Sequence, residues 1–308
     1  MTMRWGEKRF YSLDYYLKQT YHEKLYKISL NGGMTCPNRD GTLGYKGCIF
    51  CSEGGSGDFA EDASLSITKQ IEIGKMQSAS KYNGTSYIAY FQAYTNTYAP
   101  VEYLRRIFTE AIRHPDIKIL SIGTRPDCLG EEILALLEEL SKEKPVWVEL
   151  GLQTIHPSTA NYIRRGYDLP VFDNAVNELH ARGISVIVHT ILGLPGESED
   201  MMLETVSYLN TLPIDGIKFS LLHVLEGTDL AEDFRNQPFH IYTMEEYLSL
   251  LGKCIASLRQ DIVIHRLTGD GPAALLIAPT WTKNKRQVLN QLGAYLKKED
   301  IWQGKEAL

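Results

Sequence analysis

Three of the five cysteines, Cys36, Cys48 and Cys51, lie within sixteen consecutive residues in the spacing C-x11-C-x2-C. Thiolates are ligands for soft metals and for iron–sulfur clusters, and the C-x2-C pair can place two sulfurs on one centre. Pro37 and several glycines provide tight turns that can wrap the backbone around such a centre. The stretch therefore predicts a thiolate-bound metal site, and the odd number of cysteines argues against a disulfide framework.

Three kinds of cysteine site remain open at this point. A structural zinc site needs four ligands, so the fourth would have to come from Cys128, His22 or another distant residue. Alternatively, three cysteines hold a four-iron cluster and leave one iron without a protein ligand, an open position that is typical of catalytic centres. Three buried thiols without metal are the third option, although a glycine-rich polar loop makes a poor core. Cys128 and Cys254 are interpreted as packing cysteines.

The elements that must position these residues follow a regular alternation. Apolar runs that predict strands occupy residues 25–30, 86–91, 117–123, 146–152, 184–192 and 216–222, and helical stretches lie near 65–81, 101–113, 131–142, 157–165, 171–182 and 198–211. Such alternation favours an α/β fold with a parallel sheet, here a partial (β/α)6 barrel of the TIM type with its site at the carboxyl ends of the strands. We expect an N-terminal extension over 1–24, with a helix at 13–23 over the core. The barrel follows over 25–240, and an extension over 241–308 closes it.

Composition limits the function further. The chain has 308 residues, 44% of them hydrophobic, and a net charge of −6, which argues against coating nucleic acid by bulk charge. Both ends are nevertheless locally basic: residues 1–30 hold six Lys/Arg, and residues 281–298 hold five with no acid. Basic residues interleaved with aromatics fit phosphate contacts and base stacking, although a solvated helix face is the alternative. The absence of a secretory signal or a long apolar run predicts a cytoplasmic protein without membrane contact.

The cysteine loop after the first strand, with Phe50 immediately before Cys51, resembles the radical S-adenosylmethionine superfamily. The long C-x11-C spacing is similar to that of the Elongator catalytic subunit, and the whole chain resembles the bacterial YtqA/YhcC (MnmL-type) group. The resemblance implies that Cys36, Cys48 and Cys51 bind a [4Fe–4S] cluster and that S-adenosylmethionine is the second cofactor. These three cysteines are therefore the expected catalytic centre and the metal ligands.

The same resemblance implies roles for polar residues at the strand ends. Thr124 and Arg125 belong to a Thr-Arg-Pro-Asp motif, and Glu149 and Gln153 flank the end of the fourth strand, where relatives contact the cofactor's nucleoside. Arg165 would pair with the cofactor carboxylate through its guanidinium. The remaining expected cofactor residues are Phe50, Gln92 (where the superfamily has Gly-Gly-Glu), His189 and Leu194. The expected substrate residues are Arg125, Lys218, Arg266, Trp281 and Lys283.

The function implied by the resemblance is reductive cleavage of S-adenosylmethionine to a 5′-deoxyadenosyl radical, which modifies the 5-substituent of the wobble uridine of tRNA. Conversion of a carboxymethylaminomethyl to an aminomethyl group is the specific expectation. The partners would be tRNA and an electron donor such as flavodoxin or ferredoxin. Two alternatives stay open: radical chemistry on a small molecule such as a tetrapyrrole, and a non-catalytic zinc or iron–sulfur binding module.

Overall fold

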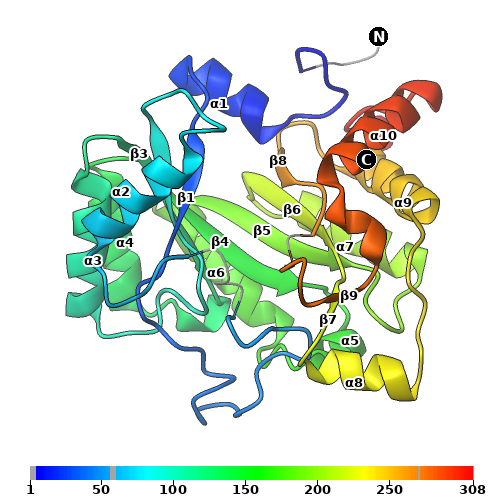
Figure 1. Cartoon of the computed structure of the whole chain (residues 1–308), viewed down its shortest axis with the longest axis horizontal. Coiled ribbons are helices and arrows are strands. Elements are labelled where there is room, and N and C mark those ends of the chain that lie inside the picture. The colour runs from blue at the N-terminus through cyan, green and yellow to red at the C-terminus, as the bar shows by residue number, and fades with distance from the viewer. Residues whose placement is uncertain (1–4, 56–59, 270, 308) are drawn as a thin grey trace.

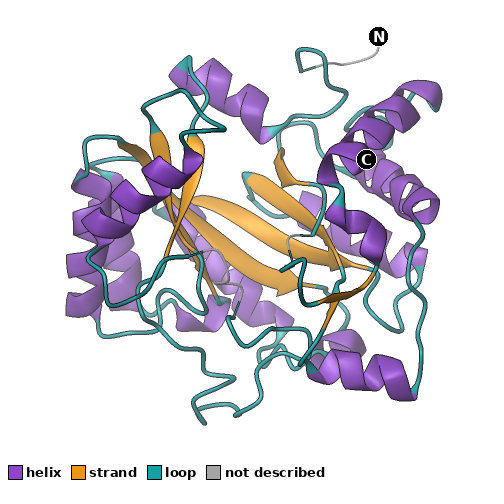
Figure 2. Cartoon of the chain, in the orientation of Figure 1, coloured by secondary structure: helices purple, strands orange, loops and turns teal. Residues whose placement is uncertain are grey.

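A curled sheet of seven parallel strands forms the centre of the molecule, in the order β1-β2-β3-β4-β5-β6-β8 (Figure 1). The computed structural model describes residues 5–55, 60–269 and 271–307. Helices cover the outer face of the curled sheet, and long loops leave its carboxyl end (Figure 2). The architecture is the partial barrel that the strand–helix alternation predicted.

The elements have the following bounds. The strands are β1 (Tyr26–Leu30), β2 (Tyr87–Phe91), β3 (Ile117–Thr124), β4 (Val146–Gln153), β5 (Ser185–Leu192), β6 (Gly216–Leu221), β7 (Val224–Leu225), β8 (Val263–Arg266) and β9 (Leu276–Ala278). The α-helices are α1 (Leu13–Tyr21), α2 (Ile67–Ser78), α3 (Val101–Arg113), α4 (Glu131–Ser141), α5 (Pro157–Tyr162), α6 (Leu169–Ala181), α7 (Glu199–Asn210), α8 (Asp229–Asn236), α9 (Met244–Ser257) and α10 (Lys285–Lys298). Two 3₁₀ turns are η1 (Pro126–Cys128) and η2 (Thr280–Lys283).

The six predicted strands correspond to β1–β6, and the sheet gains a seventh strand from the C-terminal extension. This added strand, β8, pairs in parallel with β6, with Gly216 opposite Val263. Among the described residues, β1 and β8 do not pair with each other, so the sheet stays open on one side. The extension therefore enlarges the barrel wall, while the proposed boundary at residue 240 remains a prediction.

Burial explains why the apolar runs form strands and the periodic stretches form helices. Every residue of β2 is buried, as expected for a strand covered on both faces. In α3 the predicted apolar face is buried, from Leu104 at one end to Ile112 at the other. These faces join one continuous core between the sheet and its outer helices.

Helix α1 closes the amino-terminal end of the curled sheet. Leu17 packs in a small cluster with Ile88, Ile119, Trp147 and Ile187, one residue from each of β2, β3, β4 and β5. In Figure 1 this helix lies at the opposite end of the strands from the long loop that follows β1. Because α1 closes the amino-terminal end, the carboxyl end is the accessible mouth of the barrel. In the part of the chain that the structure describes, no helix is both long and apolar enough to cross a membrane.

Candidate functional site

A cavity of about 280 Å³ opens at the carboxyl ends of the strands. Its wall combines the cysteine loop, the ends of β2–β6 and the segment after β8. Twelve of the predicted site residues line it: Cys36, Cys48, Phe50, Cys51, Gln92, Thr124, Arg125, Glu149, Gln153, Arg165, His189 and Arg266. Residues from all parts of the chain thus meet at the place where a parallel barrel collects its functional side chains.

The loop between Cys36 and Cys51 is folded on itself by one arginine. Arg39 Nη2 donates to the backbone carbonyls of Ser52 at 2.6 Å and Cys51 at 3.2 Å. Gly47 has a φ of +75°, and a Cβ there would lie 2.8 Å from Arg39 Nε. Glycine at position 47 therefore allows both the left-handed turn and the close approach of the guanidinium. The result is a compact loop whose cysteines face one cavity.

A second set of contacts fixes this loop against the barrel. Asn38 Nδ2 donates to the carbonyl of Arg164 at 2.7 Å and lies 3.5 Å from Cys48 Sγ. The hydrogen bond from the Cys51 thiol lowers the pKa of Cys48 to about 7, against the opposing effect of burial. The positive charges of Arg125 and Arg39 lower the pKa of Cys48 further. The surroundings thus favour a thiolate, the form that binds metal.

The carboxylate of Glu149 forms the floor of the cavity and is completely buried. Oε1 accepts from Lys27 Nζ at 2.6 Å and Ser121 Oγ at 2.7 Å. Oε2 accepts from His189 Nε2 at 2.7 Å and from Lys218 Nζ. Because four donors from β1, β3, β5 and β6 converge on it, Glu149 ties the inner face of the barrel together. The predicted contact of Glu149 with a ribose would compete with these four bonds.

Burial and nearby charges shift the pKa values of Glu149 and His189. Burial would raise the pKa of Glu149, but the ammonium groups of Lys218 and Lys27 hold it well below its usual range. Burial and the nearby Lys218 lower the pKa of His189 to about 4. His189 therefore lines the cavity as a neutral imidazole at pH 7, with Nε2 donating to the carboxylate.

Two arginines lie side by side on the wall beside the cysteine loop. Arg125 holds Asp127 in a two-point contact at 2.9 and 2.7 Å and donates to the carbonyl of Arg165 at 2.8 Å. Arg165 in turn donates to the carbonyls of Thr154 at 2.6 Å and Tyr167 at 3.0 Å. In the described residues, Arg165 Nη2 makes no hydrogen bond, so this nitrogen remains for a ligand in the cavity. All three guanidinium nitrogens of Arg125 already have protein partners, which favours a positioning role over the predicted substrate contact.

Four predicted residues lie outside the cavity wall, as far as the wall is described. Leu194 is buried in an apolar cluster that includes Phe50, and Lys218 is buried behind Glu149. Trp281 donates from Nε1 to the carbonyl of Tyr242 at 2.9 Å, so it packs instead of facing a ligand. Lys283 is exposed on η2. Direct contact with the bound cofactor or substrate in the cavity is therefore not favoured for Leu194, Lys218 and Trp281.

The structure brings four further residues into the site, and of these the sequence did not single out Lys27. Lys27 reaches Glu149 from β1, and the ring of Tyr90 lies between the ammonium groups of Lys27 and Lys218, 4.4 and 4.6 Å from them. Tyr167 stacks on both arginines of the wall, and His223 lines the cavity after β6. A lysine within an otherwise apolar strand was the one available signal for Lys27.

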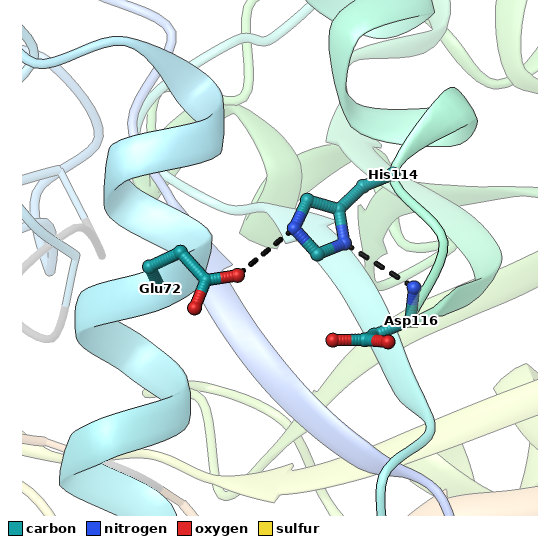
Figure 3. Close-up of side chains that lie close together, drawn as sticks. All are labelled: Glu72, His114 and Asp116. Atoms are coloured by element: carbon teal, nitrogen blue, oxygen red, sulfur yellow. Dashed lines mark hydrogen bonds and ion pairs between the residues drawn. The ribbon is translucent and has the colours of Figure 1, made fainter.

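A second group of ligand-type side chains lies on the outside of the barrel, where Glu72, His114 and Asp116 come together (Figure 3). His114 Nε2 lies 3.0 Å from Glu72 Oε1. Lys75 Nζ, however, donates to Glu72 at 2.8 Å and to Asp116 at 2.6 Å. An ammonium group already holds the position that a cation would take, so this cluster is an ion-pair network between α2 and the segment before β3.

Comparison with known proteins agrees with this geometry. Residues 35–209 match the family profile of the Radical SAM superfamily, and residues 214–298 match the Radical_SAM C-terminal domain. The chain therefore belongs to the radical SAM superfamily, as the cysteine loop predicted, and is an enzyme of that class. The cavity described above lies where residues of both matched segments meet.

Among individual proteins, the chain is similar to YtqA of Bacillus subtilis (strain 168), with 41% identity over 299 residues, 97% of this chain and 93% of YtqA. YhcC of Escherichia coli (strain K12) is 35% identical over 286 residues, covering 92% of this chain and 91% of YhcC. A tRNA uridine(34) acetyltransferase of Methanocaldococcus jannaschii is 27% identical over 161 residues, 51% of this chain and 29% of that protein. The solved Methanocaldococcus infernus Elp3 with an N-terminal deletion shares the fold, with TM-score 0.68, 17% identity and coverage of 91% of this chain and 64% of that one.

The donor set fits the iron–sulfur cluster that the family implies. The three loop cysteines are free thiols, and all face the same cavity. Asn38 supplies a hydrogen bond and two arginines supply positive charge to Cys48, and such contacts stabilise the negative charge of a bound cluster. The remaining wall offers neutral polar groups for a nucleoside and one guanidinium nitrogen for a carboxylate.

Proposed function

We propose that this radical SAM enzyme acts on tRNA and changes the 5-substituent of the wobble uridine from carboxymethylaminomethyl to aminomethyl. The single observation that carries the radical chemistry is the set of three free thiols, Cys36, Cys48 and Cys51, on one cavity wall. The two cofactors that we expect to bind in this cavity are a [4Fe–4S] cluster on these thiols and S-adenosylmethionine beside them. When both are bound, the chemistry supplied is one-electron reductive cleavage of S-adenosylmethionine to methionine and a 5′-deoxyadenosyl radical that takes a hydrogen atom from the substrate.

The protein's own residues would bind and orient these groups. Arg165 Nη2 would receive the methionine carboxylate. Gln153, Thr124 and Gln92 line the wall and would serve as neutral hydrogen-bonding groups for the nucleoside and amino ends. His189 offers a neutral imidazole beside them. Phe50 lines the cavity beside Cys51 and packs on an apolar cluster, and its ring would exclude water from the reacting atoms.

Similarity to proteins named for tRNA supports the choice of substrate. The distant relative is named a tRNA uridine(34) acetyltransferase, and the solved protein of similar fold is an Elp3. Exposed basic residues of η2 and α10, among them Lys283 and Arg286, lie in the same C-terminal segment that contributes Arg266 to the cavity. An exposed basic surface suits a phosphate backbone whose one base reaches into the cavity.

The proposed net reaction balances in atoms and electrons. The bond between the amine nitrogen and the carboxymethyl carbon breaks, water supplies the oxygen of the released two-carbon oxo acid, and the substrate loses two electrons. S-Adenosylmethionine accepts these two electrons when it becomes methionine and 5′-deoxyadenosine, and one proton is released. A flavodoxin- or ferredoxin-type donor would be the second protein partner. It would supply the electron that starts the first cleavage, and the second electron lost by the substrate would replace that electron in each turnover.

Two measurements test this function. Protein reconstituted without oxygen should hold about four irons per chain and, with dithionite and S-adenosylmethionine, form 5′-deoxyadenosine. It should then convert tRNA from a strain that lacks the gene, with aminomethyluridine appearing in the nucleoside profile. Zinc in place of iron would support a non-catalytic binding module. Deoxyadenosine formation with an unchanged tRNA profile, in the deletion strain and in vitro, would reject tRNA and favour a small-molecule substrate.

A further inference from the structure

His223 is a cavity residue that no role described above uses. It follows β6 and lines the cavity in the segment matched by the Radical_SAM C-terminal domain, together with Leu225 and Arg266. The cysteine loop and the residues fitted to S-adenosylmethionine all lie within the other matched segment, residues 35–209. The cavity thus has a cofactor side and a second side, which remains for the substrate.

The imidazole of His223 has an unused hydrogen-bonding atom. Nε2 is buried and, among the described residues, has no hydrogen-bond partner. A buried polar atom without a partner costs about 1–3 kcal/mol, so such atoms in a binding cavity mark places where a ligand completes the bonding. Burial, with the positive charges of Lys285 and Arg266, lowers the pKa of His223 to about 4, so the ring is neutral at pH 7.

Two glycines give the imidazole its position. A Cβ on Gly269 would lie 2.6 Å from the ring of His223 and 3.0 Å from the carbonyl oxygen of Leu221. A Cβ on Gly271 would lie 2.8 Å from the same ring. Any larger residue at these positions would displace the ring, so the turn after β8 is shaped around it.

We propose that His223 is a substrate-contacting residue, and that its imidazole hydrogen-bonds the polar 5-substituent of the uridine, with Gly269 and Gly271 positioning the ring. The inference rests on the proposed function, because it names the part of that substrate which His223 recognises. The nearby cationic Arg266 makes this side of the cavity suitable for a substituent that ends in a carboxylate. Recognition of the carboxymethylaminomethyl group against a plain uridine would then depend on His223.

The test compares three variants of the cluster-loaded protein. His223→Leu removes the hydrogen-bonding atom, His223→Gln keeps an amide near the position of Nε2, and Gly269→Ala displaces the ring. Loss of a hydrogen bond to a charged group predicts a fall in kcat/KM for substrate tRNA of about 10- to 100-fold for His223→Leu and Gly269→Ala, with partial rescue in His223→Gln. Iron content and the Kd for S-adenosylmethionine should stay within about twofold of wild type, since the cofactor side is untouched.

Each outcome decides between the proposals. If the wild-type enzyme turns over tRNA and His223→Leu does so at the same kcat/KM, the role of His223 is overturned and the proposed function stands. A fall in S-adenosylmethionine affinity as large as the fall in tRNA turnover would place His223 on the cofactor and also overturn it. Absence of wild-type turnover on tRNA would overturn both. Equal losses in His223→Leu and Gly269→Ala, with no further loss in the double variant, would support the positioning role of the glycine.

Discussion

Lys27 Nζ lies 2.6 Å from Glu149 Oε1, although Lys27 is on β1, Glu149 is on β4, and two strands separate them in the sheet. The contact is possible only because the sheet curls and both side chains point to its inner face. Lys218 on β6 reaches the same carboxylate from the other side. One carboxylate between two ammonium groups thus joins three distant strands beneath the cavity.

Substitution of Glu149 by Gln should therefore destabilise the fold strongly. The change leaves the buried Lys218 and the partly exposed Lys27 without their shared counter-ion, and breaking a buried pair costs about 3–5 kcal/mol. Denaturant unfolding of the purified protein measures the loss. Glu143→Gln is the matched control, because Glu143 pairs with Arg113 on the surface, where such pairs contribute about 0–1 kcal/mol. Similar losses in the two variants would show that the buried network is not a major source of stability.

Acidification should weaken the fold through His189 and His223. Each has its pKa lowered from 6.5 to about 4 in the folded protein, so the unfolded chain binds more protons between these values. The free energy of unfolding should then fall as pH drops from about 6.5 to about 4, by at most about 1.4 kcal/mol per pH unit for each histidine.

His189→Gln should reduce that slope, because one of the linked histidines is gone. Urea unfolding at several pH values in this window checks the expectation. An unchanged slope in His189→Gln would mean that this imidazole titrates in the folded state much as it does in the unfolded chain.

Cys51→Ala should abolish cluster binding. The variant is expected to retain well under half of the roughly four irons of the wild type and to form no 5′-deoxyadenosine. Cys254→Ala is the matched control, because Cys254 is buried in α9 and does not belong to the described lining of the cavity. The control should keep its iron and its activity. Iron retention and cofactor cleavage in Cys51→Ala would contradict the assignment of the ligands.

Charge reversal on the C-terminal surface should weaken tRNA binding. Lys283 and Arg286 are exposed, and loss of a phosphate contact lowers both the affinity and its dependence on salt, by about one unit of the log–log slope for each contact. Titrations of Lys283→Glu and Arg286→Glu at several salt concentrations measure the effect. Lys142→Glu, which changes an exposed lysine at the amino-terminal end of β4, should bind like wild type. If the salt dependence of tRNA affinity is the same in the wild type and in all three variants, the surface around Lys283 and Arg286 does not contact tRNA.

Local sequence patterns determined much of this protein. Continuous apolar runs fixed the strands because both faces of a parallel sheet are covered, and the apolar period fixed α3 to its observed bounds, Val101–Arg113. The closely spaced cysteines on a loop after a strand predicted the metal centre, because thiol chemistry and turn residues are local properties. Polar residues at strand ends were predicted to meet, since those ends converge in any parallel barrel.

Only the tertiary structure decided how these residues pair. Lys27 and Glu149 are 122 residues apart, and Lys218 and Glu149 are 69 apart, so no local pattern relates them. The direction in which a strand residue points depends on the curl of the whole sheet, which is why Lys218 proved to be a buried counter-ion. The place of His223 against Gly269 likewise depends on two segments that meet only after β6 and β8 have paired.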